Sequence, residues 1–292
     1  MIMIEIKGGI GNQLFQYAAA RSLAYQNNSK LGIDKSFFEI NGYSKRELSL
    51  QHLNINPKIK FISMLKKIKY LRKIGFLSKY LINDIVEEKS NEFIYEKINY
   101  KYGKLNVMTG YFQSYKFFED IRPILIEEIK PRKKSIALNK YINLLEGAKK
   151  TVSLHVRRGD YVELGWELEI NYYINALNEI IKKVEIENPL EIFVFSDDLL
   201  WCENNILNEI PEKCNVTLVD DNSLKDYEEI FLMSLCDNNI ISNSTFSWWG
   251  AWLNQKKDKI VISPEKWIDN KNVKEFDIIP KEWIIISGEN CE

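Results

Sequence analysis

The stretch TVSLHVRRGDYV, residues 151–162, decides the fold of the second half of the chain. Its first six residues form a strand-like run that contains Val152, Leu154 and Val156, and charged residues follow directly. Four more strand-like runs come later, separated by segments with helical periodicity. Because strands and helices alternate regularly, we expect a parallel sheet covered by helices on both faces. The later runs lie at 191–195, 216–219, 239–242 and 259–262, and the helical segments cover about 171–186, 199–209, 225–236 and 245–254.

The first half opens with the same kind of unit. An apolar run at residues 2–6 leads into a glycine-rich segment, and apolar residues then recur at helical spacing as far as Leu23. A second strand-like run follows at 31–34, which gives a β-loop-α-β opening. The charged stretch 130–134 contains a proline and suits a linker, and 292 residues are enough for two domains. We therefore expect domains at 1–150 and 151–292, with the boundary at or shortly after that linker.

The composition excludes several functional classes. With 40 Lys and Arg against 41 Asp and Glu, the net charge is −1, which argues against a nucleic-acid partner bound by charge. The only histidines, His52 and His155, are too few for a metal site made of several histidines, and the four cysteines include no CxxC pair. The N-terminus lacks the features of a signal peptide, and no apolar run is long enough to span a membrane. We expect a cytoplasmic protein, or one peripheral to the inner face of the cytoplasmic membrane.

The membrane alternative rests on residues 58–79. They carry eight basic residues and no acidic one, interleaved with apolar side chains. One interpretation is a basic amphipathic helix that lies on an anionic membrane surface. The other is an ordinary surface helix whose lysines face water.

The sequence GGIGNQ, residues 8–13, connects the first strand to the first helix. Glycines there permit close approach of a ligand to the backbone, and the helix N-terminus offers free N–H groups. Gly9 and Gly11 fit the dinucleotide fingerprint GxGxxG, but Leu14 occupies the third glycine position. Because Asp34 lies near the place of a ribose-binding acid, an NAD(P)- or flavin-dependent oxidoreductase stays open. A tight structural turn is the other interpretation.

Charged side chains end the strand at 151–156. His155, Arg157 and Arg158 lie where parallel sheets bind ligands, at the carboxyl end of the strand. Two adjacent guanidiniums there could supply planar, bidentate donors for phosphate oxygens, with Asp160 holding one of them. A surface pair of arginines in salt bridges is the alternative.

Two other strand ends carry polar residues of a different kind. Ser244 and Thr245 precede a helix, so their hydroxyls could bind an anion together with the free N–H groups, or only cap the helix. Asp197 or Asp198 could accept the N1–H and exocyclic amine of guanine, or serve as a helix N-cap. Together the three strand ends could hold a nucleoside diphosphate. No DxD motif of the kind that binds a divalent metal is present, so we expect no metal cofactor, with arginines stabilising the leaving group.

The chain resembles the bacterial α-1,2-fucosyltransferases of glycosyltransferase family 11. The resemblance runs from about Ile4 to Trp267 and is carried by GGIGNQLFQYAAARSLA, GYFQS, HVRRGDYV, FSDD and DYEEIFLMSLCDNNIISNSTFSWWGAWLN. It implies a GT-B-like α/β architecture, with two Rossmann-like domains and a cleft between them. It also implies inverting, metal-independent transfer of L-fucose from GDP-β-L-fucose to the 2-hydroxyl of a galactose or similar acceptor. That acceptor would belong to a cell-surface glycan such as an O-antigen, either as an oligosaccharide or linked to a lipid.

The resemblance further implies roles for individual residues. Arg158 would be the main group that stabilises the departing GDP, and Arg157 would support it. A general base is not evident, and Asp160, Glu163 and Glu167 are the candidates. The predicted catalytic residues are Arg158, Asp160 and Asn12; the predicted GDP-fucose site adds His155, Arg157, Asp197, Asp198, Ser244, Thr245 and Phe246; Gly9, Gly11, Asn12 and Gln13 would face fucose and the acceptor.

One departure and three alternatives qualify this interpretation. Asn171 stands where many members of the family have the Asp of a Leu-Asp-Tyr-Tyr-like element, so acceptor selectivity does not carry over through 162–173. An oxidoreductase would leave the HVRRGDY and SNSTFSWW segments unexplained. A non-catalytic sugar- or nucleotide-binding module, and a fucosyltransferase of different linkage or another GDP-sugar, are the remaining alternatives.

Overall fold

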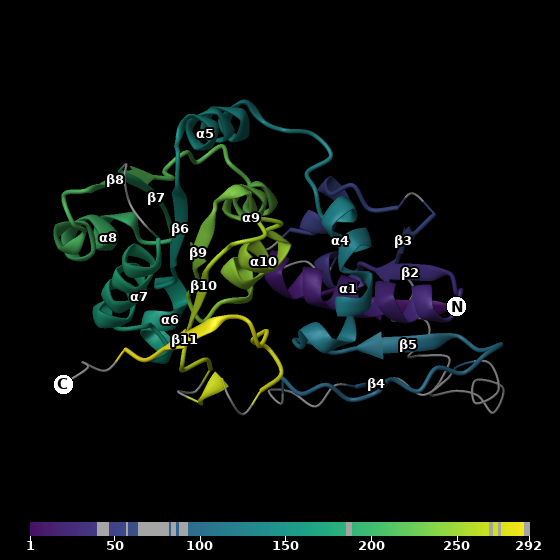
Figure 1. Cartoon of the computed structure of the whole chain (residues 1–292). Coiled ribbons are helices and arrows are strands. Elements are labelled where there is room, and N and C mark those ends of the chain that lie inside the picture. Colours follow the sequence, from purple (N-terminus) through teal and green to yellow (C-terminus); the bar gives the residue numbers. More distant parts are fainter. Residues whose placement is uncertain are drawn as a thin grey trace. The chain divides into compact units, whose positions relative to one another are not determined.

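The chain forms two compact units (Figure 1). The computed structural model describes residues 1–39, 47–56, 58–63, 82, 86–87, 93–184, 189–268, 271–273 and 276–288. Unit 1 comprises Met1–Arg132 and Phe276–Ile278, and unit 2 comprises Lys133–Glu275 and Ile279–Glu292. Each unit is built on its own parallel sheet. The predicted α/β class is confirmed.

Unit 1 contains a five-stranded parallel sheet in the order β3-β2-β1-β5-β4. Helix α1 (Ile10–Gln26) connects β1 to β2, as its apolar spacing predicts, and most of its residues are buried. The strands are β1 (Ile2–Glu5), β2 (Leu31–Asp34), β3 (Lys60–Ile62), β4 (Val86–Glu87) and β5 (Asn106–Thr109); the other helices are α4 (Arg122–Glu128) and the short η1 (Ser36–Glu39), η2 (Ser49–His52), η3 (Tyr115–Phe117) and η4 (Glu119–Ile121).

A buried ion pair joins α1 to α4 in this unit. Arg21 donates to both carboxylate oxygens of Glu128 at 3.0–3.2 Å, and Tyr17 donates its hydroxyl hydrogen to the same carboxylate at 2.5 Å. Burial is the largest cause that raises the pKa of Tyr17, and the Glu128 charge adds to it, so the phenol stays protonated and remains a donor. The side chains of Arg21 and Tyr17 therefore both depend on the Glu128 carboxylate.

Replacing Glu128 by glutamine is expected to lower the free energy of unfolding by about 1–3 kcal/mol, because the amide turns N–H groups toward Arg21 or Tyr17 in a buried site. Urea denaturation measures the change. Glu127→Gln is the matched control on the same helix, since Glu127 is exposed and pairs only with Lys130 among the described residues; it should stay within about 0.5 kcal/mol. Equal effects of the two substitutions would contradict the assignment.

Unit 2 contains a six-stranded parallel sheet in the order β11-β10-β9-β6-β7-β8. Figure 1 shows α7 and α8 on one face of this sheet and α9 and α10 on the other, as the alternation predicts. The five predicted strands are present, and β11 at the edge is an addition. The strands are β6 (Thr151–Val156), β7 (Leu190–Ser196), β8 (Cys214–Leu218), β9 (Asn238–Ile240), β10 (Val261–Pro264) and β11 (Ile284–Ile286); the helices are α5 (Ile136–Gly147), α6 (Gly159–Leu164), α7 (Ile170–Lys183), α8 (Leu199–Asn205), α9 (Asp226–Leu235), α10 (Thr245–Leu253) and the short η5 (Leu207–Glu209).

The two units divide between Arg132 and Lys133, inside the predicted linker. Helix α5 therefore lies in unit 2, whereas the expected boundary at 150 gave it to the first domain. The physical reason is a direct contact with α9. The Ser135 N–H, at the start of α5, donates to Glu228 Oε1 at 2.8 Å, and Glu228 is only 1% exposed. The other oxygen of Glu228 accepts from the Lys225 N–H at 3.2 Å.

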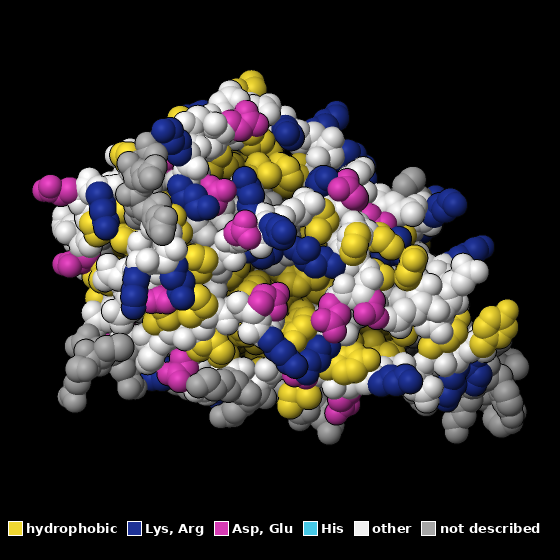
Figure 2. Space-filling model, viewed as in Figure 1, with side chains coloured by type: hydrophobic (Ala, Val, Ile, Leu, Met, Phe, Trp, Pro, Cys, Tyr) yellow, Lys and Arg dark blue, Asp and Glu magenta, His cyan; other side chains and the backbone are white. Residues whose placement is uncertain are grey.

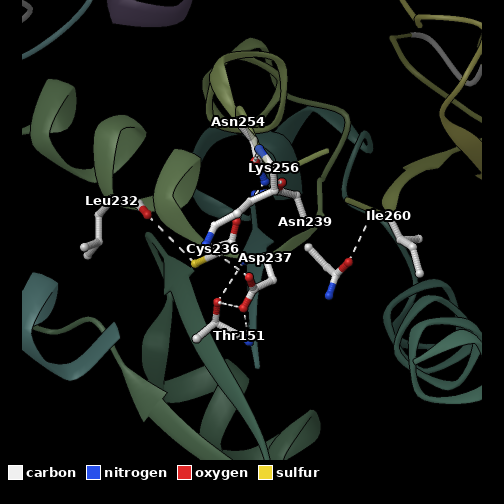
Figure 3. Close-up of polar contacts among 9 residues, drawn as sticks. Thr151, Leu232, Cys236, Asp237, Asn239, Asn254, Lys256 and Ile260 are labelled. Carbon is white, nitrogen blue, oxygen red and sulfur yellow. Dashed lines mark hydrogen bonds and ion pairs between the residues drawn. The ribbon is translucent and has the colours of Figure 1, made fainter. Parts of the chain in front are cut away.

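A buried polar network closes the amino edge of the unit 2 sheet (Figure 3). Thr151, the first residue of β6, donates its N–H and hydroxyl hydrogen to Asp237 Oδ2, both at 2.9 Å, and the Asp237 N–H donates back at 2.8 Å. Asn254, which follows α10, donates to the Cys236 carbonyl and to Asn239 Oδ1, both at 2.8 Å. These bonds fasten β6, β9 and α10 at the edge opposite their ligand-binding end.

Candidate active site

The carboxyl edge of the unit 2 sheet gathers the predicted donor-site residues. β6 lies between β9 and β7, so the three segments that follow these strands become neighbours. Polar groups at this edge occupy the place where open α/β sheets bind ligands. The segments bring together His155, Arg157 and Arg158 after β6, Asp197 and Asp198 after β7, and Ser244, Thr245 and Phe246 after β9.

The two aspartates hold the two arginines. Arg157 forms ion pairs with Asp160 and, at 2.7 Å, with Asp197. The Arg158 N–H donates to the other oxygen of Asp197 at 2.9 Å, and its Nε–H donates to Asp198 at 3.1 Å. Asp198 also caps α8 by accepting from the Trp201 N–H at 3.1 Å. Both carboxylates are thus engaged by protein groups, and the predicted contact of Asp197 or Asp198 with guanine gains no support from this geometry.

Gly159 makes this close arrangement of charges attainable. A Cβ on Gly159 would lie 2.5 Å from Asp197 Oδ2, which is closer than carbon and oxygen can approach. Glycine therefore lets the Asp197 carboxylate reach the backbone beside it. Arg157 and Arg158 can therefore both bind Asp197, because Gly159 has no side chain that would clash with its carboxylate.

Arg158 keeps two donor positions toward the site. Its guanidinium carbon lies 4.1 Å from the centroid of the Trp201 ring, a cation–π contact that fixes the plane of the fork. The side chain is mostly buried, yet neither terminal nitrogen hydrogen-bonds to a residue that the structure describes. A planar guanidinium whose Nε is already bound by Asp198 is suited to bind a phosphate through its two terminal nitrogens.

His155 is enclosed and uncharged. It is 5% exposed, its Nδ1 lies 2.9 Å from Ser242 Oγ, and its ring centroid lies 5.3 Å from that of Phe246. Burial, and secondarily the charge of Arg157, lowers its pKa to about 3. The neutral ring can therefore offer one N–H donor at physiological pH.

The segment after β9 carries a helix cap and a buried amide. Ser244 Oγ accepts from the Phe246 N–H at 3.3 Å, so the alternative interpretation of Ser244 as an N-cap is present in the structure. Asn243 is 1% exposed and donates to the carbonyls of Trp166 and Trp267 at 2.7 and 2.9 Å. This amide fixes the start of α10 relative to the segment after α6.

Glu229 on α9 is a candidate site residue that the sequence interpretation did not include. Its carboxyl is close enough to Asp197 and Asp226 to interact with both electrostatically, and burial is the largest of the three causes that raise its pKa to about 7. It forms no hydrogen bond or ion pair with any residue in the described part of the chain. The neighbouring Glu228 instead accepts hydrogen bonds from the N–H groups of Ser135 and Lys225. Nothing in the sequence DYEE distinguishes Glu228 from Glu229.

Stability of the ligand-free protein is expected to fall as pH rises through about 7, because of Glu229. An unfolded glutamate titrates near ~4.3, so above that pH the folded protein holds a proton that the unfolded chain has lost. This contribution is fully present below the unfolded pKa and disappears above the folded pKa. Melting temperatures of the wild type and of Glu229→Gln, measured between about pH 5 and pH 8, check this prediction. The melting temperature of the variant should rise relative to that of the wild type as pH increases. A difference in melting temperature that does not change with pH would contradict the raised pKa of Glu229.

The glycine-rich loop of unit 1 adjoins the segment after β5. Gly8 has a left-handed φ of +82°, and a Cβ there would lie 3.0 Å from Asn12 Nδ2. Gln113, which was not predicted, donates to Asn12 Oδ1 at 2.7 Å and follows Phe112, whose φ of +53° is rare for a bulky side chain. Gly9 is the N-cap of α1, and Gly11 is buried within its first turn.

The side chain of Gln13, which was predicted to face fucose and the acceptor, is buried among backbone groups. It is 0% exposed, and its amide donates to the carbonyls of Gly8 and Glu47 at 3.0 and 2.8 Å while accepting from the Ser49 N–H at 3.0 Å. All of its hydrogen-bonding positions but one are occupied by backbone groups. Gln13 therefore fastens the loops around α1, because its side chain points into the protein rather than toward a ligand.

Comparison with known proteins identifies the family. The model of glycosyl transferase family 11 matches residues 1–287. The chain belongs to this family. The O-antigen biosynthesis glycosyltransferase WbnK of Escherichia coli is 33% identical over 296 residues, which cover 91% of this chain and 95% of the relative. The protein is accordingly a glycosyltransferase, as the resemblance of its motifs implies.

Other family 11 relatives and solved structures extend the comparison. An α-1,2-colitosyltransferase of Escherichia coli is 27% identical and covers 98% of this chain and 99% of the relative. The mouse galactoside 2-α-L-fucosyltransferase Sec1 is 26% identical over 87% of this chain and 64% of its own length. The α-1,6-fucosyltransferase NodZ of Bradyrhizobium, co-crystallized with GDP, has a TM-score of 0.56 at 14% identity, covering 85% of this chain and 91% of that one. These folds confirm the predicted GT-B-type architecture; the cleft between the domains stays a prediction.

The structure does not support the oxidoreductase alternative, because Asp34 is not available to bind a ribose. Asp34 is 0% exposed and accepts hydrogen bonds from the N–H and hydroxyl of Ser36, the first residue of η1. A ribose would have to displace these bonds. The glycine loop is therefore better explained by the turn into α1 and by the contact of Gly8 with Asn12.

Three further predictions for this glycosyltransferase concern metal, membrane and nucleic acid. The described residues contain no group of three His, Cys, Asp or Glu placed to hold a metal ion, and no described helix has the length and apolarity to cross a membrane. Most of the basic stretch 58–79 lies outside the described residues. On the face seen in Figure 2, basic side chains are interspersed with acidic ones, so that face carries no continuous basic surface for a nucleic acid.

Proposed function

We propose that this family 11 glycosyltransferase transfers L-fucose from GDP-β-L-fucose to the 2-hydroxyl of a galactose residue in a cell-surface glycan. The single observation that carries the proposal is the state of Arg158. Its Nε donates to Asp198, its guanidinium carbon lies over the Trp201 ring, and its terminal nitrogens bind no residue that the structure describes. A diphosphate leaving group is the anion that such a fork fits.

The carboxyl edge of the unit 2 sheet would stabilise the negative charge that develops on GDP. When the bond between fucose and the diphosphate breaks, negative charge grows on the departing phosphate oxygens, and preorganised donors lower the barrier most at that point. Arg158 would supply these donors, and the N–H groups at the start of α10 would add a positive dipole end. Asp160 pairs with Arg157, so we assign it a supporting role there rather than that of a base.

Guanine would be recognised by Glu229 instead of the two aspartates. A carboxylate can accept both the N1–H and the exocyclic amine of guanine, whereas adenine presents no such pair of donors. Glu229 lacks a hydrogen-bond or ion-pair partner in the described part of the chain and lies near Asp197. An opposing ligand donor pair would favour its ionised form, which burial disfavours in the free protein.

Asn12 would serve the sugar side of the reaction. This role rests on the resemblance of GGIGNQ to family 11, and it is supported by the Gln113 hydrogen bond that orients the Asn12 amide. In this role the Asn12 amide would hydrogen-bond a hydroxyl of fucose or of the acceptor. We expect an acceptor hydroxyl to attack fucose on the face opposite GDP, in a transition state with oxocarbenium character.

The sugar of the donor is a second variable, because one relative at 27% identity is a colitosyltransferase. The test offers the protein GDP-fucose, GDP-colitose and UDP-galactose with a galactoside acceptor, in EDTA, and determines the linkage of any product by NMR. An α-1,2-fucosylated galactoside supports the proposal, and transfer of colitose alone would replace the donor sugar. Transfer only from UDP-galactose, or dependence on added metal, would overturn it.

A further inference from the structure

The hydroxyl of Ser242 contacts the ring of His155 in a closed environment. Ser242 is 0% exposed, and its Oγ lies 2.9 Å from His155 Nδ1. Among the described residues this is the only hydrogen-bond partner of Ser242 Oγ, since the other bond of Ser242 runs from its N–H to Ser247 Oγ. The proton between Ser242 and His155 can therefore be placed by accounting for donors and acceptors.

Two arrangements of the hydrogen atoms are open to this pair. If Nδ1 carries the ring proton, it donates to Ser242 Oγ, and the hydroxyl hydrogen is left buried without an acceptor, which costs about 1–3 kcal/mol. If the hydroxyl donates to Nδ1, every hydrogen at the contact is satisfied and the ring proton lies on Nε2. The second arrangement is the more stable one.

The other edge of the ring is consistent with this choice. Nε2 has no hydrogen bond to a described residue, yet it is absent from the polar atoms that are fully enclosed without a partner. The ring is neutral at physiological pH because burial and the Arg157 charge lower its pKa. A neutral imidazole carries one N–H, so the tautomer decides whether its accessible nitrogen donates or accepts.

We infer that Ser242 is a positioning residue, whose hydroxyl holds His155 in the Nε2–H tautomer so that the ring offers a fixed donor to an acceptor atom of the bound nucleotide. The identity of that ligand rests on the proposed function. In this tautomer Nε2 cannot accept a proton, so His155 does not serve as the general base. A second consequence is that the first serine of SNSTF acts through the histidine of HVRRGDY, although the two residues lie 87 positions apart in the sequence.

Nuclear magnetic resonance tests the tautomer directly, because the chain has two histidines. Protein labelled with ¹⁵N-histidine is recorded without ligand near neutral pH, and His52→Gln assigns the signals. The expected spectrum has a protonated Nε2 and an unprotonated Nδ1 for His155. A protonated Nδ1 in the wild type would overturn the inference, and this measurement needs no variant of Ser242 and no nucleotide.

Variants of Ser242 test its effect on binding. Ser242→Ala is expected to populate both tautomers and to raise the dissociation constant of GDP about tenfold, through loss of one fixed donor. Ser242→Thr, which keeps the hydroxyl, should restore the Nε2–H tautomer. Ser263→Ala is the matched control, a buried serine on β10 whose hydroxyl bonds to the Pro264 carbonyl, and it should change neither readout.

The outcomes separate this inference from the proposed function. An unchanged tautomer and unchanged GDP affinity in Ser242→Ala would contradict the positioning role. Failure of wild-type protein to bind GDP, with His155 still in the Nε2–H tautomer, would instead overturn the assignment of the nucleotide. Should Ser242→Ala not fold, the wild-type spectrum decides the tautomer by itself.

Discussion

Replacing Arg158 by alanine is expected to lower kcat about 10²–10³-fold with GDP-fucose as donor, the effect typical of deleting one group that stabilises transition-state charge. The structure gives the physical reason. Asp198 and Trp201 hold the guanidinium from one side, so its remaining N–H groups are preorganised before the substrate arrives. The melting temperature should change little in comparison, because the fork is positioned for a ligand rather than for the core.

Two further variants make this result specific. Arg158→Lys keeps the charge but loses the planar fork and the contact of Nε with Asp198, so it should recover only a small part of the activity. Lys183→Ala removes another cation of unit 2, one that pairs with Glu179 along α7, and should leave kcat unchanged. Near-normal turnover by Arg158→Ala would refute the assignment of the leaving-group site.

Replacing Glu229 by glutamine is expected to weaken GDP binding about 100-fold and to remove most discrimination between GDP and ADP. Hydrogen bonds to a charged group are worth about 1.5–3 kcal/mol each, and the amide replaces one of two acceptors by a donor that opposes guanine. Titration calorimetry with both nucleotides, above pH 7 where the wild-type carboxyl is ionised, measures the change.

Two further substitutions in unit 2 serve as a control and as a test of the alternative that Asp197 recognises guanine. Glu179→Gln alters a carboxylate on the surface of α7 and should leave nucleotide affinity unchanged. Asp197→Asn should weaken binding through the loss of its Arg157 ion pair while keeping the preference for GDP over ADP. If Asp197→Asn loses that preference and Glu229→Gln keeps it, the base is recognised by the aspartate that the sequence interpretation chose.

The sequence predicted the sheet of unit 2 well because its strands are buried on both faces. A buried parallel strand often appears in the sequence as an apolar run, and the run near 191–195 is clearly distinct from the amphipathic helices beside it. The edge strand β11 was not expected although residues 283–286 are all apolar, and β3 and β4 are too short to form a clear apolar run. Helix α5 falls in unit 2 and not with the residues before it, and the sequence does not reveal this because the Ser135–Glu228 contact joins residues 93 positions apart.

Some candidate site residues could be chosen from the sequence, and others only from the fold. Cations at a strand end are conspicuous in a sequence, and Arg157 and Arg158 could therefore be chosen as candidates without a structure. Which carboxylate faces a ligand depends on contacts distant in sequence, such as those that occupy Asp197 and Asp198 and leave Glu229 without one. Gln13 and Gln113 show the same limit, because only the fold reveals that the first is enclosed and the second contacts Asn12.

The most direct test of the central claim is calorimetric titration of the wild-type protein with GDP, UDP, ADP and NAD in EDTA. The carboxyl edge of the unit 2 sheet, with Arg158 for the diphosphate and Glu229 for the base, predicts that GDP binds without metal and that the other three bind at least about tenfold more weakly. Tight binding of NAD or ADP with no heat from GDP would contradict the account and return attention to the glycine loop of unit 1.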